Sequence, residues 1–150
     1  MPNKEDSSPL DSLIDAAFAR FAEVDFELSK LEEPARTMVI ITSAQGRIDN
    51  GGLRCFFEGD FPGTPPYSLF EEAYARIGCA TISAAIKDAV RSFGLASPES
   101  CVEERRAYMN DHLDEESQAI RGWDDRGCGD TTVWSKLVQW ALERKVDGTD

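Results

Sequence analysis

Four cysteines and a single histidine are the residues of this chain best suited to nucleophilic or metal chemistry. The cysteines occur singly and far apart, at Cys55, Cys79, Cys101 and Cys128. Zinc ligands usually come in closely spaced pairs such as C-x-x-C, and thiols in the cytoplasm usually stay reduced. His112 could activate a cysteine, but it follows Asn110 and Asp111 in a polar stretch that favours exposure. We therefore expect buried thiols, with no zinc site and no disulfide.

Carboxylates are abundant enough to suggest a calcium site or acid–base catalysis. The aspartates of residues 124–130 do not fall at the alternating positions of a calcium loop, and the closing glutamate is absent. Neighbouring carboxylates such as Glu71 and Glu72 point about 100° apart on a helix, so they do not converge on one substrate. The chain also lacks a phosphate-binding glycine loop, G-x-S-x-G and H-E-x-x-H. The sequence predicts a protein that is not an enzyme and needs no metal or cofactor.

The composition restricts both the class of protein and its partners. Among 150 residues, 28 are acidic and 16 are basic, which gives a net charge of −12, and 41% are hydrophobic. A chain of this size can form one domain with a single core. No apolar run approaches the ~20 residues of a membrane-spanning helix, and acids at Glu5, Asp6 and Asp11 do not suit a secretory signal. We expect a cytoplasmic protein that binds neither nucleic acid nor membranes and prefers a basic protein partner.

The acidic excess is confined to two segments. Residues 1–33 contain nine acidic and three basic residues, and residues 99–130 contain ten acidic and four basic residues, so each segment carries −6. Residues 34–98 and 131–150 are neutral. These acidic segments are either solvated helix faces or a recognition surface.

Apolar residues recur at helical spacing through most of the chain. The pattern predicts a helix from Ser8 or Pro9 to about Ser29 and a second from Glu33 to the Asn50-Gly51-Gly52 sequence, with a strand as the weaker alternative for its Val-Ile-Ile run. Further helices are expected at 68–77, 79–93, 102–109, 113–123 and 131–145. Of these, 68–77 and 79–93 should form a hairpin joined at Gly78, and 131–145 should bury Trp134. The expected fold is all-α, a compact single-domain bundle of about six to eight helices over residues 8–147, after a flexible end at 1–7.

Two stretches carry a resemblance to a known family. Residues 46–57 read GRIDNGGLRCFF, and residues 71–79 read EEAYARIGC. Together they resemble the small acidic bacterial DNA-mimic proteins, a domain of unknown function with an Asn-Gly-Gly-aromatic start, a Phe-Phe pair and a helix ending in Ile-Gly. The matching residues are Asn50, Gly51, Gly52, Phe56, Phe57, Ile77 and Gly78, whereas Leu53 and Cys55 replace an aromatic and a polar residue. The resemblance covers about residues 34–142.

The resemblance implies an all-α fold and an acidic surface that occupies the DNA-binding face of a transcription factor. The matching residues themselves are expected to shape the core and its turns. Carboxylates one helical turn apart repeat at ~5.4 Å and can approximate a line of phosphates. The candidate acidic surface consists of Glu23, Glu27, Glu32, Glu33, Glu99, Glu103, Glu104, Asp111, Asp114, Glu115 and Glu116.

Three alternatives stay open from the sequence. The same carboxylates would suit an immunity or antitoxin-like inhibitor that blocks a cationic enzyme. A small hydrolase or ligand binder would instead need a pocket that joins Cys55 to His112. A homodimer is also compatible with the sequence.

Overall fold

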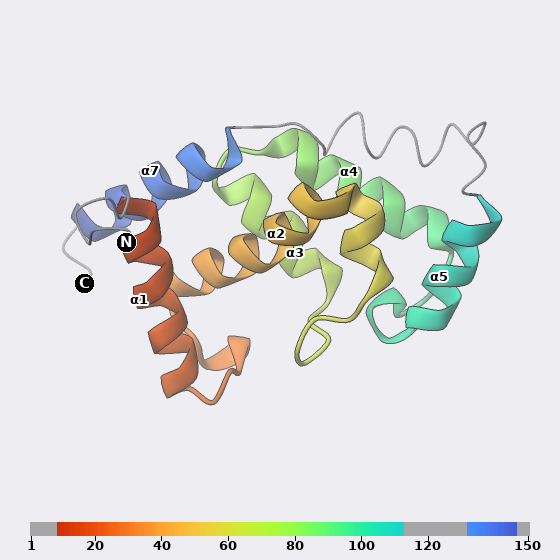
Figure 1. Ribbon diagram of the computed structural model, residues 1–150, viewed down its shortest axis with the longest axis horizontal. Helices are drawn as coiled ribbons and strands as arrows, with labels where there is room; N and C mark the ends of the chain where they lie inside the picture. The colour runs from red at the N-terminus through yellow and green to blue at the C-terminus, as the bar shows by residue number, and fades with distance from the viewer. Residues whose placement is uncertain (1–8, 113–131, 147–150) are drawn as a thin grey trace, which may run out of the picture.

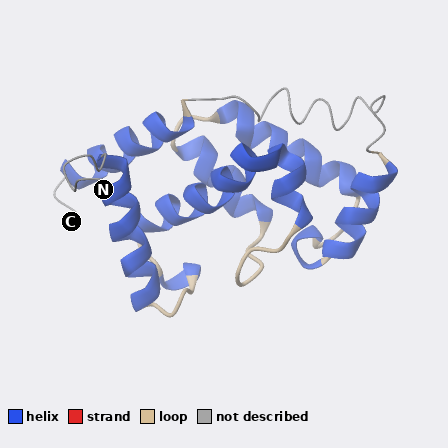
Figure 2. Ribbon diagram, in the orientation of Figure 1, coloured by secondary structure: helices blue, strands red, loops and turns tan. Residues whose placement is uncertain are grey.

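The computed structural model describes residues 9–112 and 132–146. Helices make up the regular structure of these residues, and no strand occurs among them, so the all-α prediction is confirmed (Figures 1 and 2). The elements are α1 (Pro9–Glu23), η2 (Leu28–Lys30), α2 (Ala35–Glu58), α3 (Tyr67–Arg76), α4 (Ala80–Phe93), η3 (Pro98–Ser100), α5 (Val102–Asp111) and α7 (Val133–Val146). The central helix α2 contacts α1, α3, α5 and α7. The predictions for 1–7 and 113–123 fall on residues outside the described part.

Helix α1 begins at Pro9 as expected, but it ends at Glu23 and not near Ser29. The amide of Phe26 donates to the carbonyl of Phe21, and the amide of Asp25 donates to that of Ala22. This pair of bonds is a Schellman motif, which terminates a helix by satisfying its last carbonyls. Asp25 has φ +56°, the left-handed conformation that the motif requires. The helix therefore stops six residues earlier than its apolar pattern suggested.

Helix α2 does not end at the two consecutive glycines. Its backbone leaves helical geometry at Gly51 (φ −156°) and Gly52 (φ +73°) and then resumes as far as Glu58. A left-handed residue at Gly52 suits glycine, which has no Cβ to clash. The expected termination is therefore wrong, because the glycines kink one long helix. The strand alternative is also wrong, since the Val-Ile-Ile run is helical.

The hairpin of α3 and α4 has the expected position and the most extensive contact between any two described helices. Gly78 joins them with φ +92°. The amide of Cys79 donates to the carbonyl of Tyr74, and the amide of Gly78 donates to that of Ala75, so α3 also ends in a Schellman motif. The glycine thus allows only three residues, 77–79, to separate α3 from α4.

An aromatic cluster forms the centre of the core. Phe56 and Phe57 have no exposed surface, in agreement with their expected role in the core. Phe56 lies within 5.6 Å, centroid to centroid, of Phe61, Tyr67 and Phe70. Offset and edge-to-face ring pairs of this kind stabilise a core beyond their area of burial. Burial also raises the pKa of Tyr67 to about 12, against the opposing effect of the nearby Arg105 guanidinium.

Helix α7 packs with a face rotated from the predicted one. Its buried residues are Val133, Leu137, Trp140 and Ala141. Trp134 is only half-buried, and its indole nitrogen donates to Asp49 Oδ2 at 3.0 Å. The expectation that Trp134 is the buried tryptophan is therefore wrong, because its polar edge is held at the surface by an aspartate. No described helix is long and apolar enough to cross a membrane.

Candidate protein-interaction surface

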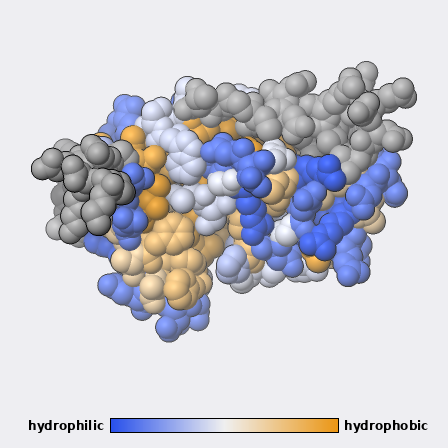
Figure 3. Space-filling view, viewed as in Figure 1, coloured by the Kyte–Doolittle hydropathy of each residue, from blue (hydrophilic) through white to orange (hydrophobic). Residues whose placement is uncertain are grey.

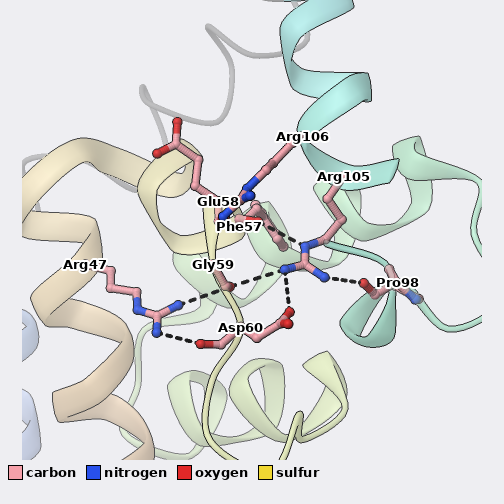
Figure 4. Close-up of polar contacts among 8 residues, drawn as sticks. All are labelled: Arg47, Phe57, Glu58, Gly59, Asp60, Pro98, Arg105 and Arg106. Carbon is pink, nitrogen blue, oxygen red and sulfur yellow. Dashed lines mark hydrogen bonds and ion pairs between the residues drawn. The ribbon is translucent and has the colours of Figure 1, made fainter. Parts of the chain in front are cut away.

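Arg105 of α5 is the largest side chain with no exposed surface. Its guanidinium donates to the carbonyls of Phe57, Pro98 and Gly59 at 3.0, 2.6 and 3.2 Å, and it pairs with Asp60 Oδ1 at 2.9 Å (Figure 4). A guanidinium provides five donors in a fixed planar arrangement, which suits several converging acceptors. Arg105 thereby fixes α5 against the end of α2 and the loop that follows it.

Two further arginines bind the same loop. Arg47 donates to the carbonyls of Gly59 and Asp60 at 3.1 and 2.9 Å, and its guanidinium carbon lies 3.8 Å from the Phe61 ring centroid. Arg106 donates to the carbonyl of Glu58 at 2.7 Å. The last carbonyls of a helix lack partners within the helix, and cations are favourable near them. The three arginines, which we call the arginine clamp (Arg47, Arg105 and Arg106), thus complete the end of α2 (Figure 4).

The exposed surface of α5 carries three acids and one base, Arg106. Glu103 and Glu104 occupy its first turn, Asp111 lies at its end, and all three are exposed. None of them has an ion pair with a described residue, because Arg105 and Arg106, the only bases of the helix, bind the α2 end. Acids in the first turn also favour the helix dipole. Of the other candidates, Glu99 is half-buried, and Asp114, Glu115 and Glu116 lie outside the described residues.

The acids near the end of α1 are placed among bases. Glu23, Glu27 and Glu32 are exposed. Lys30 Nζ lies 3.3 Å from Glu27 Oε2, and a shallow hollow brings Arg20 and Lys30 together with Glu23 and Glu32. One acid of this surface therefore forms an ion pair, unlike the exposed acids of α5.

Glu33 has a structural role that the sequence did not predict. Its carboxylate accepts hydrogen bonds from the Thr37 amide and hydroxyl, both at 2.8 Å, and from Arg76 Nη1 at 2.9 Å. An acceptor at this position satisfies a free amide in the first turn of α2. Because Arg76 and the helix end already balance its charge, Glu33 is a poor candidate for partner binding.

The two acidic groups do not form one surface in the described part of the chain. Helix α1 and the segment after it lie at one end of the long axis, and α5 lies at the other (Figure 1). A single short binding element therefore cannot contact both groups.

The residues considered for catalysis are not brought together. Cys55 is half-buried, and its sulfur lies 3.8 Å from the Asn50 amide nitrogen. The His112 ring packs on Tyr108, with a centroid distance of 4.3 Å. Cys79 is buried, Cys128 lies outside the described residues, and the described residues contain no group of three or more potential metal ligands. A joint site of Cys55 and His112 has no support from these contacts.

Comparison with known families assigns the chain to one domain family. A model of the DMP19-like protein family matches residues 29–144. Because the match covers most of the 150 residues, the chain belongs to this family. No curated protein and no solved structure matches the chain.

Proposed function

We propose that this protein is a non-catalytic acidic binding module that occupies the basic DNA-binding face of a bacterial DNA-binding protein, such as a transcription factor, in the cytoplasm. The observation that supports this proposal is the one-sided charge of α5. Arg105 is buried against the α2 end and Arg106 binds the Glu58 carbonyl, whereas Glu103, Glu104 and Asp111 are exposed and have no ion pair with a described residue. A basic groove that approaches α5 therefore meets carboxylates that have no ion pair with a described residue.

The spacing of these acids supports competition with DNA. Glu104 and Asp111 are seven residues apart, which is about 10 Å along a helix. Phosphates follow each strand of a duplex every ~3.4 Å, so two carboxylates at this separation can meet cations that normally contact phosphates a few nucleotides apart. Charge complementarity of this type mainly raises the association rate and weakens with salt.

A capture experiment with two matched variants tests this proposal. Bacterial proteins that bind DNA-cellulose are passed over the immobilised full chain at low and moderate salt. The paired substitution of Glu103→Lys and Glu104→Lys should reduce capture at least tenfold. Glu72→Lys is the matched control, because Glu72 is an exposed carboxylate of α3 that has no ion pair with a described residue. This control should reduce capture less than twofold.

Equal capture by the Glu103/Glu104 variant, or no capture at either salt, would overturn the proposal. The identity of the captured protein separates mimicry from the alternative role as an inhibitor. A nuclease or another cationic enzyme that does not compete with DNA for this protein would favour the inhibitor.

A further inference from the structure

An apolar groove lies between α1 with the segment after it and the loop that follows α2. Its lining includes Phe18, Phe26 and Leu28 from α1 and the segment after it, Val39 from α2, and Phe61 and Pro62 from the loop after α2. The cavity volume is about 240 Å³. Figure 3 shows an apolar area over this part of the face with hydrophilic surface below it. Cavities of about 150 Å³ can bind benzene, so this groove has room for one large apolar side chain.

Phe26 is held at this groove by an unusual backbone. Its side chain is 59% exposed, and its ring packs edge-on against Phe21 at 5.2 Å. The Schellman motif explains the left-handed conformation of Asp25 and the contact with Phe21. It does not require Phe26 to be left-handed as well, yet Phe26 has φ +60°. Bulky residues rarely adopt this region, and such strain tends to occur at functional sites.

Asp25 is the acid at the rim of the groove that lacks a counter-charge among the described residues, whereas Glu27 pairs with Lys30 at the surface. Asp25 and Glu27 flank Phe26. Asp60 precedes Phe61 on the other side, but its carboxylate already pairs with Arg105. Arg47 lies on the Phe61 ring, but its donors bind the carbonyls of Gly59 and Asp60. Asp25, without a counter-charge among the described residues, therefore favours a cationic group beside Phe26.

We infer that this groove binds a basic peptide segment of a protein partner, in which one large apolar side chain inserts beside Phe26 and a flanking Lys or Arg residue meets Asp25. DNA has no such apolar anchor, so mimicry by α5 does not account for the groove. The inference goes beyond the proposed function, and it concerns a second contact site that does not include the exposed acids of α5.

Peptide selection on the full chain tests the inference. Peptides of twelve residues are selected from a random display library, and their affinities are measured for the unmodified protein and for variants. The selected peptides should combine an aromatic or leucine residue with one or more Lys or Arg residues. Phe26→Ala removes the exposed ring, and Ser43→Leu fills the groove from α2, where Ser43 is half-buried. Each substitution should weaken binding at least tenfold.

Two control variants separate this site from other surfaces. Leu142 of α7 is the other large hydrophobic residue exposed in the described part, at 43%, so Leu142→Ala is the matched control. It should change affinity less than twofold, and so should Glu104→Lys at the α5 end. Loss of binding with Glu104→Lys would assign the peptides to the acidic surface of α5 and overturn the groove site.

Other results would also overturn the inference. These are selected peptides that lack basic residues, no selected peptides at all, or unchanged affinity in both the Phe26 and Ser43 variants. Binding to phosphatidylserine vesicles that depends on Phe26 would assign the groove to membranes. A dimer in sedimentation analysis that Phe26→Ala abolishes would assign it to a second copy of the chain.

Discussion

The α5 end and the α1 end both present exposed carboxylates, but they differ in the position of the neighbouring cations and in the exposure of apolar side chains. At the α5 end, Arg105 is buried and the exposed Arg106 binds a carbonyl, so the acids of α5 have no ion pair with a described residue. At the α1 end, Arg20 and Lys30 remain at the surface, and a phenylalanine is exposed beside them. Local net charge alone therefore does not define a binding surface, because the direction of each base and the exposure of apolar groups decide what can bind.

The largest effect is expected from removing the buried arginine. Arg105→Met should lower the free energy of unfolding by about 3–4 kcal/mol, because three carbonyls and Asp60 each lose a hydrogen bond in a site with little water. Arg106→Met removes one exposed bond and should cost no more than about 1 kcal/mol. Urea denaturation of both variants measures the difference. Equal losses would contradict the special role of Arg105.

Tyr67, near Arg105, should make the stability of the fold decrease at alkaline pH. Burial raises the pKa of Tyr67 to about 12 in the folded protein, compared with 10.0 for the ordinary phenol. Above pH 10 the unfolded chain releases this proton first, so stability falls as pH rises towards 12. The loss should not exceed about 2–3 kcal/mol.

Urea denaturation at pH 8, 10 and 11 should show a smaller decrease for Tyr67→Phe than for the unmodified protein. Tyr74→Phe is a useful comparison, because burial raises the pKa of Tyr74 well above 10 as well. A decrease of equal size in the Tyr67 variant and the unmodified protein would show that Tyr67 does not contribute.

The ends of α1 and α3 allow a matched test of backbone strain. Both helices end in Schellman motifs, with Asp25 at the left-handed position of one and Gly78 at that of the other. Gly78→Ala should destabilise the fold by about 1 kcal/mol, since a new Cβ would meet nothing within 4 Å and only the backbone conformation opposes it. Asp25→Gly should have the opposite sign and stabilise by about 0.5–1 kcal/mol. Thermal denaturation of both variants tests this, and a destabilised Asp25→Gly variant would argue against strain at α1.

Much of the fold follows from local sequence patterns. Periodic apolar residues predict α3, α4, α5 and α7 well, because burial of one face stabilises each helix. The end of α1 was missed, since Asp25 and Phe26 are not residues that usually adopt left-handed conformations. The continuation of α2 was missed because two glycines usually stop a helix, whereas here Phe56 and Phe57 fix its last turns in the core.

The candidate surfaces were less predictable than the helices. Arg105 stands in a run of charged residues, Glu103 to Arg106, which is typical of a solvated helix face. Only the tertiary packing of α5 on α2 brings its guanidinium to the carbonyls of Phe57 and Gly59. The separation of the two acidic groups and the groove at Phe26 likewise depend on contacts between distant segments. Sequence alone identified the acids of α5 but not the inward arginines that leave them without a counter-charge.

The smallest effect on stability is expected at the acidic surface of α5 itself. The paired substitution of Glu103→Lys and Glu104→Lys removes favourable interactions with the helix dipole, which should cost about 0.5 kcal/mol at 0.15 M salt because both side chains are exposed. This cost should shrink further at 1 M salt, whereas the loss from Arg105→Met should change little, since the Arg105 guanidinium is shielded from solvent ions. Denaturation at the two salt concentrations measures both. A large, salt-independent loss in the glutamate variant would mean that these acids support the fold, and any loss of partner binding could then no longer be attributed to the surface charge.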